Sequence, residues 1–213
     1  MTKQKFLSQV IEGKAFISNV DQNLKFWIDK IEQVPFSNER KRSRSHFETL
    51  TLSIISQQIS TKAADAIAKR VALASGGSIS IESVQSLKFE DLRECGLSAN
   101  KVRSIQELTE YFCEHQISQR TFAYKSDREI KEMLTQIWGI GPWTVDMFLM
   151  FSLRRLDVWP TGDLGVRKGW SIISKSPVLS EKEFEKVGDA FKPFRSLVAW
   201  YCWKATDESS ETW

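Results

Sequence analysis

Histidine and cysteine are scarce in this chain of 213 residues, which contains two histidines and three cysteines. Neither type forms a cluster with the spacing of zinc ligands, so the sequence predicts no metal ion held by side chains. The cysteines are odd in number and far apart, which argues against a disulfide framework. We therefore expect an enzyme or binding protein that works without a cofactor.

Long apolar runs are also missing. The first residues are not followed by the apolar core of a secretory signal, and no run approaches the roughly 20 residues that a membrane helix needs. The net charge of +3 permits nucleic-acid binding without indicating it. Residues 37–45 form a basic link, which we interpret as a solvated loop rather than a phosphate-contacting patch. We expect an intracellular protein with no membrane segment.

Sustained alternation of apolar and polar residues, which would indicate β-strands, is absent. Apolar residues recur instead at helical spacing, as in the series Val20, Leu24, Trp27 and Ile31. Ser60 is placed to cap a helix that ends at Gly76, and Ser126 with Glu129 has the pattern of a capping box. The sequence therefore predicts an all-α chain of about ten helices, and its length suits one domain of ordinary size or one domain in two lobes.

The most informative stretch is a sharp turn between two helical patterns within residues 134–153. Gly139 and Gly141 flank one apolar residue, so the backbone can turn sharply and approach another molecule closely. Pro142 suits the first turn of the helix that follows. The first amides of that helix would point outward and form an anion site that fits a nucleic-acid phosphate. A purely structural joint between two core helices explains the turn alone equally well.

Asp163 is the candidate catalytic residue. It lies at the start of a predicted helix, where an aspartate is by itself more readily interpreted as an N-cap. Tryptophan is over-represented, with eight residues, six of them between positions 138 and 203. Indoles mostly serve cores but can also stack on bases. Together with the phosphate-binding turn, and with no second candidate base, these features favour a catalytic Asp163.

The turn at 139–144, followed by Asp163, resembles the helix-hairpin-helix DNA glycosylase superfamily. Residues 54–64 and 192–203 are similar to its alkylpurine branch, the DNA-3-methyladenine glycosylase II group. The resemblance covers about residues 40–205, and its four blocks occur in the right order. It implies an all-helical fold with a helix-hairpin-helix motif, organised as a single two-lobed domain over residues 1–213.

The resemblance also implies a function. The protein would act as a monomer on double-stranded DNA, flip out an alkylated purine and hydrolyse its N-glycosidic bond, with Asp163 as the catalytic carboxylate. The hairpin, about residues 127–153, would hold the phosphate next to the lesion through backbone amides at Gly139, Gly141 and Thr144. Members that also nick DNA have a lysine where this chain has Trp143, so the resemblance implies a hydrolase without lyase activity.

A base pocket and a wedge residue are implied in the same way. Trp143 would line the pocket and attract a cationic base, Phe194 maps to its second aromatic, and Met147 stands where one branch has an aromatic residue. Gln58 or Ile59 would fill the gap left by the flipped base, although a cap glutamine and a core isoleucine are alternative interpretations. The tryptophans expected mainly in the core are Trp138, Trp159, Trp170, Trp200 and Trp203.

Two other functions stay open at this point. One is a glycosylase for a different damaged base, because Met147 and Phe194 can reshape the pocket. The other is a helix-hairpin-helix protein that binds DNA without chemistry, and the complete motif with Asp163 argues against it.

Overall fold

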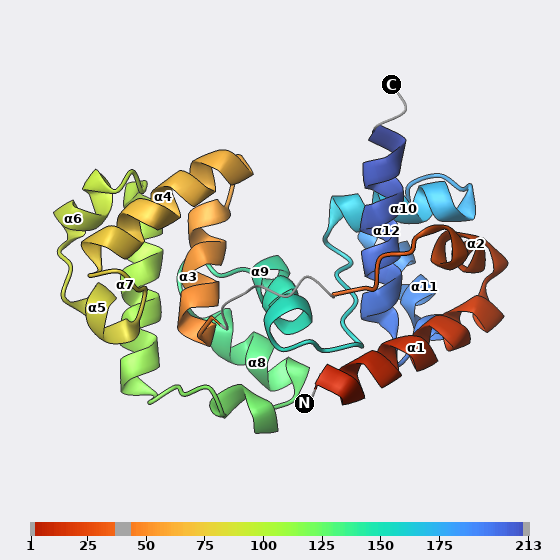
Figure 1. Cartoon of the computed structure of the whole chain (residues 1–213), viewed down its shortest axis with the longest axis horizontal. Helices are drawn as coiled ribbons and strands as arrows, with labels where there is room; N and C mark the ends of the chain where they lie inside the picture. The colour runs from red at the N-terminus through yellow and green to blue at the C-terminus, as the bar shows by residue number, and fades with distance from the viewer. Residues whose placement is uncertain (1–2, 37–43, 211–213) are drawn as a thin grey trace. The chain divides into compact units, whose positions relative to one another are not determined.

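The computed structural model describes residues 3–36 and 44–210, which form helices joined by turns, with no β-strand among them (Figure 1). The all-α prediction is therefore confirmed for the described part of the chain. The chain divides into two compact units. The first contains residues 1–39 and 149–213, and the second contains residues 40–148.

The first unit begins with two helices where the sequence predicted only one. Its α-helices are α1 (Lys3–Val20), α2 (Gln22–Lys30), α10 (Leu164–Ser174), α11 (Glu181–Val187) and α12 (Arg195–Ser210). The helix predicted from Val20 to Ile31 is confirmed as α2, but it starts later than predicted, because Asp21 has an extended backbone and separates it from α1. The Asp21 side chain accepts a hydrogen bond from the amide of Leu24, so this residue caps α2.

The helix α12 forms the centre of the first unit, since α1, α2 and α10 all pack against it (Figure 1). Its buried hydrophobic residues are Leu197, Val198, Ala199, Trp200, Tyr201, Cys202 and Ala205. A helical stretch that is apolar on all sides, as residues 197–202 are, belongs in a core. Helix α10 crosses it at Gly169, where an ideal Cβ would lie 1.9 Å from the carbonyl oxygen of Cys202. Only glycine permits this approach, which brings the start of α10 beside the last turns of α12.

The second unit contains the remaining α-helices. They are α3 (His46–Ser56), α4 (Thr61–Ala74), α5 (Ile81–Gln85), α6 (Phe89–Glu94), α7 (Ala99–Glu114), α8 (Asp127–Leu134) and α9 (Pro142–Met147). Helix α3 packs on α4 and α7, and α8 packs on α9. The predicted cap at Ser60 and the capping box of Ser126 with Glu129 are both confirmed. Of the predicted basic link, residues 37–43 lie outside the described residues.

Candidate active site and nucleic-acid interface

The hairpin consists of α8, a turn and α9, and its two helices are joined by an ion pair. Lys131 of α8 lies 2.6 Å from a carboxylate oxygen of Asp146 on α9. Burial raises the pKa of Asp146, while the neighbouring Lys131 acts in the opposite direction. A buried carboxylate needs such a partner, so the pair holds the two helices of the hairpin together.

The turn of the hairpin is anchored to the rest of its unit at Gly139. This residue has a φ of +80°, and an ideal Cβ there would lie 2.1 Å from the hydroxyl oxygen of Ser104 on α7. Its carbonyl oxygen accepts a hydrogen bond of 3.0 Å from the side-chain amide of Gln57. The same amide nitrogen lies 3.5 Å from the hydroxyl of the buried Thr144. The fold itself therefore requires the glycine at 139.

Gly141 is different, because nothing in the fold demands a glycine there. Its φ of −90° suits any residue, and no atom lies within 4 Å of an ideal Cβ. It is the N-cap of α9 and offers no side-chain cap. In the same unit α3, α4, α7 and α8 each begin with a serine whose side chain accepts an amide hydrogen bond. Because Gly141 is exposed and has no side chain to cap α9, an acceptor from another molecule has room to approach the first amides of this helix.

Two predicted pocket residues lie on α9. Trp143 is 47% exposed and Met147 is half-buried. An indole with half of its surface exposed is available to a ligand, unlike a core tryptophan. Trp143 is thus accessible enough for the base contact predicted for it, and that contact stays a prediction.

The turn after α3 carries the two candidate wedge residues. Gln58 is exposed and has a φ of +58°, in the left-handed region, and Ile59 is 38% exposed. Neither residue belongs to the core. The ammonium of Lys101 holds the turn by donating to the carbonyl oxygens of Ile55 at 2.8 Å and Gln57 at 2.7 Å. Burial lowers the pKa of Lys101. Gln57, which the sequence did not single out, links this turn to the hairpin.

Trp138 is not a core residue, contrary to the prediction. It is 47% exposed, and the guanidinium of Arg103 lies over its ring at 4.1 Å from the centroid. Its backbone amide donates to a carboxylate oxygen of Glu107 at 3.2 Å. Ile137 and Ile140 take the buried positions of this turn, so the ring of Trp138 packs on a surface arginine instead. Trp159, Trp170 and Trp200 are buried, as predicted.

Asp163 lies in the first unit, at the N-terminus of α10. Its Oδ1 accepts a hydrogen bond of 2.9 Å from the amide of Val166, which confirms the N-cap interpretation. The residue is only 8% exposed. The same Oδ1 also accepts a hydrogen bond of 3.2 Å from the indole nitrogen of Trp203 on α12. Burial raises the pKa of the adjacent Cys202 thiol, and the charge of Asp163 adds to this effect.

Trp203 was expected in the core, but it is half-buried and bonded to the candidate catalytic residue. Its ring lies against the ring of Phe151, with centroids 5.7 Å apart and planes at 33°. Phe151 is 52% exposed. The sequence did not indicate these contacts of Trp203, because residues 151, 163 and 203 lie far apart in the chain and meet only in the folded unit.

Phe194 is 8% exposed and packs inside the first unit. Its ring centroid lies 5.8 Å from that of Phe16 on α1, and its ring fills the space beside Gly13. These contacts account for a packing role. The contact of Phe194 with a base stays a prediction.

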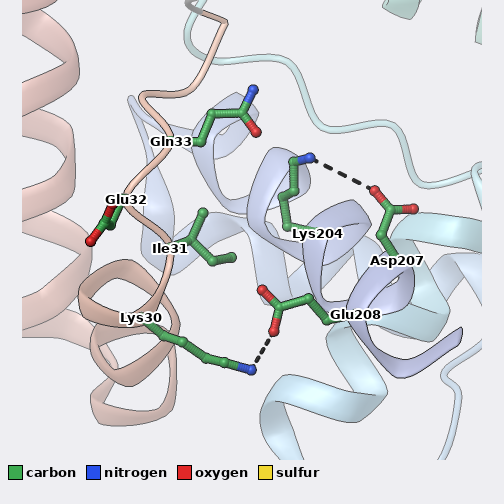
Figure 2. A pocket seen from close by; sticks show the side chains of 7 residues that line it. All are labelled: Lys30, Ile31, Glu32, Gln33, Lys204, Asp207 and Glu208. Carbon is green, nitrogen blue, oxygen red and sulfur yellow. Dashed lines mark hydrogen bonds and ion pairs between the residues drawn. The ribbon is translucent and has the colours of Figure 1, made fainter. Parts of the chain in front are cut away.

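A separate cavity of about 640 Å³ lies in the first unit (Figure 2). It is lined by Lys30, Ile31, Glu32, Gln33, Lys204, Asp207 and Glu208. Both lysines are ion-paired there, Lys30 with Glu208 and Lys204 with Asp207 (Figure 2). None of the residues predicted for the site lines this cavity, and we assign it no ligand.

Within residues 3–36 and 44–210, no three histidine, cysteine, aspartate or glutamate side chains gather in a way that could hold a metal ion. A separate search of the same residues finds no helix with the length and apolar character that a bilayer crossing requires.

Comparison with known proteins gives a family match over most of the chain. Residues 52–191 match the profile described as HhH-GPD superfamily base excision DNA repair protein. DNA-3-methyladenine glycosylase 1 of Schizosaccharomyces pombe is 33% identical over 208 residues, which are 96% of this chain and 91% of that protein.

Two solved structures of 3-methyladenine glycosylases are similar to this chain in fold. One is the S. pombe 3-methyladenine DNA glycosylase Mag1 in complex with abasic DNA, with a TM-score of 0.79 and 33% sequence identity. The alignment covers 91% of this chain and 95% of the Mag1 chain. A DNA-3-methyladenine glycosidase from Bacillus halodurans has a TM-score of 0.80 at 30% identity, with coverages of 93% and 92%. The predicted helix-hairpin-helix glycosylase fold is confirmed by these similarities.

Proposed function

Because this chain belongs to the HhH-GPD superfamily of base excision DNA repair proteins, we propose that it is a DNA glycosylase. Its substrates would be alkylated purines in double-stranded DNA, such as 3-methyladenine and 7-methylguanine. The observation that carries the proposal is Asp163, a buried carboxylate at the start of α10 that accepts donors from two helices. The similar proteins named above, which are 3-methyladenine glycosylases, support the substrate class.

Hydrolysis of the N-glycosidic bond of an alkylated purine requires only one catalytic carboxylate. Alkylation at N3 or N7 gives a purine positive charge, so the base leaves without the acid that ordinary glycosidases supply. Its departure develops positive charge on the sugar. A carboxylate of Asp163, fixed in advance, stabilises that charge and orients or deprotonates the attacking water.

The hairpin would bind the DNA backbone. We propose that the amides of Gly139, Gly141 and Thr144 hold the phosphate next to the lesion, since α9 starts without a side-chain cap and the space at Gly141 is open. Phosphate contacts position a protein on DNA without reading sequence. The protein would work inside the cell as a monomer.

The pocket and the absence of a lyase step are proposed from α9 and from the C-terminal block. The exposed indole of Trp143 would stack on the cationic base, an attraction of about 1–2 kcal/mol when water is excluded, with Met147 and Phe194 as further pocket residues. Trp143 replaces the lysine of strand-nicking relatives, so no amine at this position can form a Schiff base with the sugar. Hydrolysis is therefore the proposed reaction.

Gln58 is the proposed wedge, with Ile59 beside it. Its exposure and left-handed backbone suit a side chain that enters the gap left by a flipped base. Replacement of Gln58 by alanine should slow excision from duplex DNA more than from single-stranded DNA, where no gap has to be filled. Equal slowing on both substrates would contradict the wedge assignment.

One experiment separates the candidate functions. The protein is incubated with methylated DNA, and the released bases are identified by chromatography. Release of 3-methyladenine or 7-methylguanine supports the proposal, and release of only deaminated or oxidised bases from damaged DNA would replace it with another lesion preference. DNA binding without release of any base would favour a non-catalytic protein. Strand nicking without heat or alkali would contradict the hydrolase assignment.

A further inference from the structure

One oxygen of Asp163 has two donors of different origin. The amide of Val166 belongs to the same helix and lies 2.9 Å away, as in an ordinary N-cap. The indole nitrogen of Trp203 lies 3.2 Å away, on a helix 40 residues further along the chain. A cap alone leaves the carboxylate free to rotate about its last bond, whereas two donors to Oδ1 fix its plane and therefore the direction of Oδ2.

The indole is itself held in place by several contacts. Its ring lies against Phe151, 5.7 Å between centroids. Gly165 lies beside it, and an ideal Cβ there would be 3.3 Å from the indole ring and 3.0 Å from Oδ1 of Asp163. The close crossing at Gly169 sets the distance between α10 and α12. The packing of the unit thus fixes both the donor and the acceptor.

We propose that Trp203 is a positioning residue for the Asp163 carboxylate, an inference that rests on the proposed glycosylase function. An indole donates a hydrogen bond but carries no charge. It therefore orients the carboxylate without cancelling the negative charge that the sugar needs in the transition state. An arginine or lysine in its place would form an ion pair and weaken that stabilisation. Preorganisation of this kind acts on the chemical step rather than on DNA binding.

The test compares Trp203→Phe with Trp203→His at about pH 8, where imidazole is neutral but still has an N–H. Base release from methylated DNA is measured under single-turnover and steady-state conditions. Loss of the donor in Trp203→Phe should lower kcat by a factor of ten to about a hundred, the range expected when a reacting group loses its orientation. KM and the affinity for DNA with an abasic-site analogue should not change.

The order of activities distinguishes a positioning role from a packing role. If the donor matters, kcat falls in the order wild type, Trp203→His, Trp203→Phe. If only packing matters, phenylalanine is the better replacement and the order of the two variants reverses, which would overturn the proposal. Trp203→His also keeps the test decisive if Trp203→Phe fails to fold.

Trp200→Phe is the matched control, because it removes a buried indole from the same helix without touching Asp163. Its kcat, corrected for the folded fraction from thermal unfolding, should equal that of the wild type. Asp163→Asn distinguishes failure of the positioning role of Trp203 from failure of the proposed glycosylase function. If Asp163→Asn is inactive while Trp203→Phe is as fast as wild type, the positioning role fails and the proposed function stands. If the wild type releases no base, the proposed function itself fails.

Discussion

The hairpin and the surroundings of Asp163, here called the Asp163 corner (residues 163–169 with Trp203), differ in how much of their space and of their surface the protein itself occupies. At the Asp163 corner the glycine at 169 is required by the protein, since the carbonyl of Cys202 occupies the space beside it. At the hairpin the glycine at 141 faces open space. The Asp163 carboxylate is 8% exposed and accepts two internal donors, whereas Trp143 on α9 is 47% exposed.

This difference separates two tasks. A group that takes part in chemistry benefits from being fixed before the substrate arrives. A surface that binds DNA needs accessible donors and room for the backbone to approach. We therefore expect substitutions at the Asp163 corner to change stability or the chemical step, and those at the exposed hairpin positions to change affinity for DNA.

The largest effect on stability is expected at Gly169. An added methyl group in Gly169→Ala would meet the backbone of α12, which cannot move aside as a side chain can. The cost should be about 3 kcal/mol of unfolding free energy, measured by urea denaturation. Gly141→Ala is the control and should lose no more than about 1 kcal/mol, because alanine only replaces glycine as the N-cap of α9. Equal stability of the two variants would remove the distinction between the two regions.

Gly141→Val keeps the backbone N–H but adds a branched side chain where the phosphate would approach. It should reduce affinity for DNA by about tenfold, the effect of weakening one hydrogen bond to a charged phosphate. The reduction should be the same for unrelated DNA sequences, measured by fluorescence anisotropy at one salt concentration. Thermal unfolding should change little, because the space at this residue is open and only the N-cap preference of α9 is affected. Gly139→Ala, by contrast, should lower stability. A sequence-dependent loss of binding by Gly141→Val would contradict the phosphate assignment.

A smaller effect is expected at Gln57, whose amide donates to the carbonyl oxygen of Gly139. Gln57→Leu removes this bond and should lower the unfolding free energy by about 1 kcal/mol. The backbone amides of residues 139–144 should then exchange their hydrogens faster than in the wild type. Gln58→Leu changes the neighbouring residue, for which no bond to the hairpin is observed, and serves as the control. Faster exchange in both variants would show that the turn after α3, rather than the Gln57 bond, restrains the hairpin.

The smallest effect concerns pH. Burial between Phe122 and Phe148 lowers the pKa of His46, while a hydrogen bond that the ring donates to the backbone of Gln119 acts in the opposite direction. A lowered pKa means that the folded state favours neutral histidine, so this contribution is present above the unfolded value of about 6.5 and is lost as pH falls below it. His46→Gln should therefore lose less stability than wild type between about pH 7.5 and 5.5. Parallel losses would exclude this contribution.

Local signals were the part of the fold that sequence could predict. The caps at Ser60, Ser126 and Asp163 depend on contacts three residues apart, which a short stretch of sequence contains in full. The break at Asp21 was missed, although it uses the same chemistry, because apolar residues continue at helical spacing through it. Helix α1 was missed although Phe6, Val10 and Ile17 lie at helical spacing on its buried side, because Gly13 interrupts this apolar series.

The candidate site could be predicted only as a set of residues. Asp163, the hairpin glycines and Trp143 follow from the resemblance to a known superfamily. The bond from Trp203 to Asp163 and the bond from Gln57 to Gly139 join residues 40 and 82 positions apart. Such pairs are decided by how helices pack, and no local pattern records them. The exposure of Trp138 was missed for the same reason.

The most direct test of the account is a comparison of wild type and Asp163→Asn on one methylated duplex. Asparagine caps a helix as well as aspartate does and keeps an acceptor for Trp203, so the variant removes the negative charge with little change in structure. We predict that Asp163→Asn binds the duplex with wild-type affinity and releases alkylated base at least about a hundredfold more slowly. Release at the wild-type rate would contradict the central claim that the Asp163 carboxylate carries the reaction.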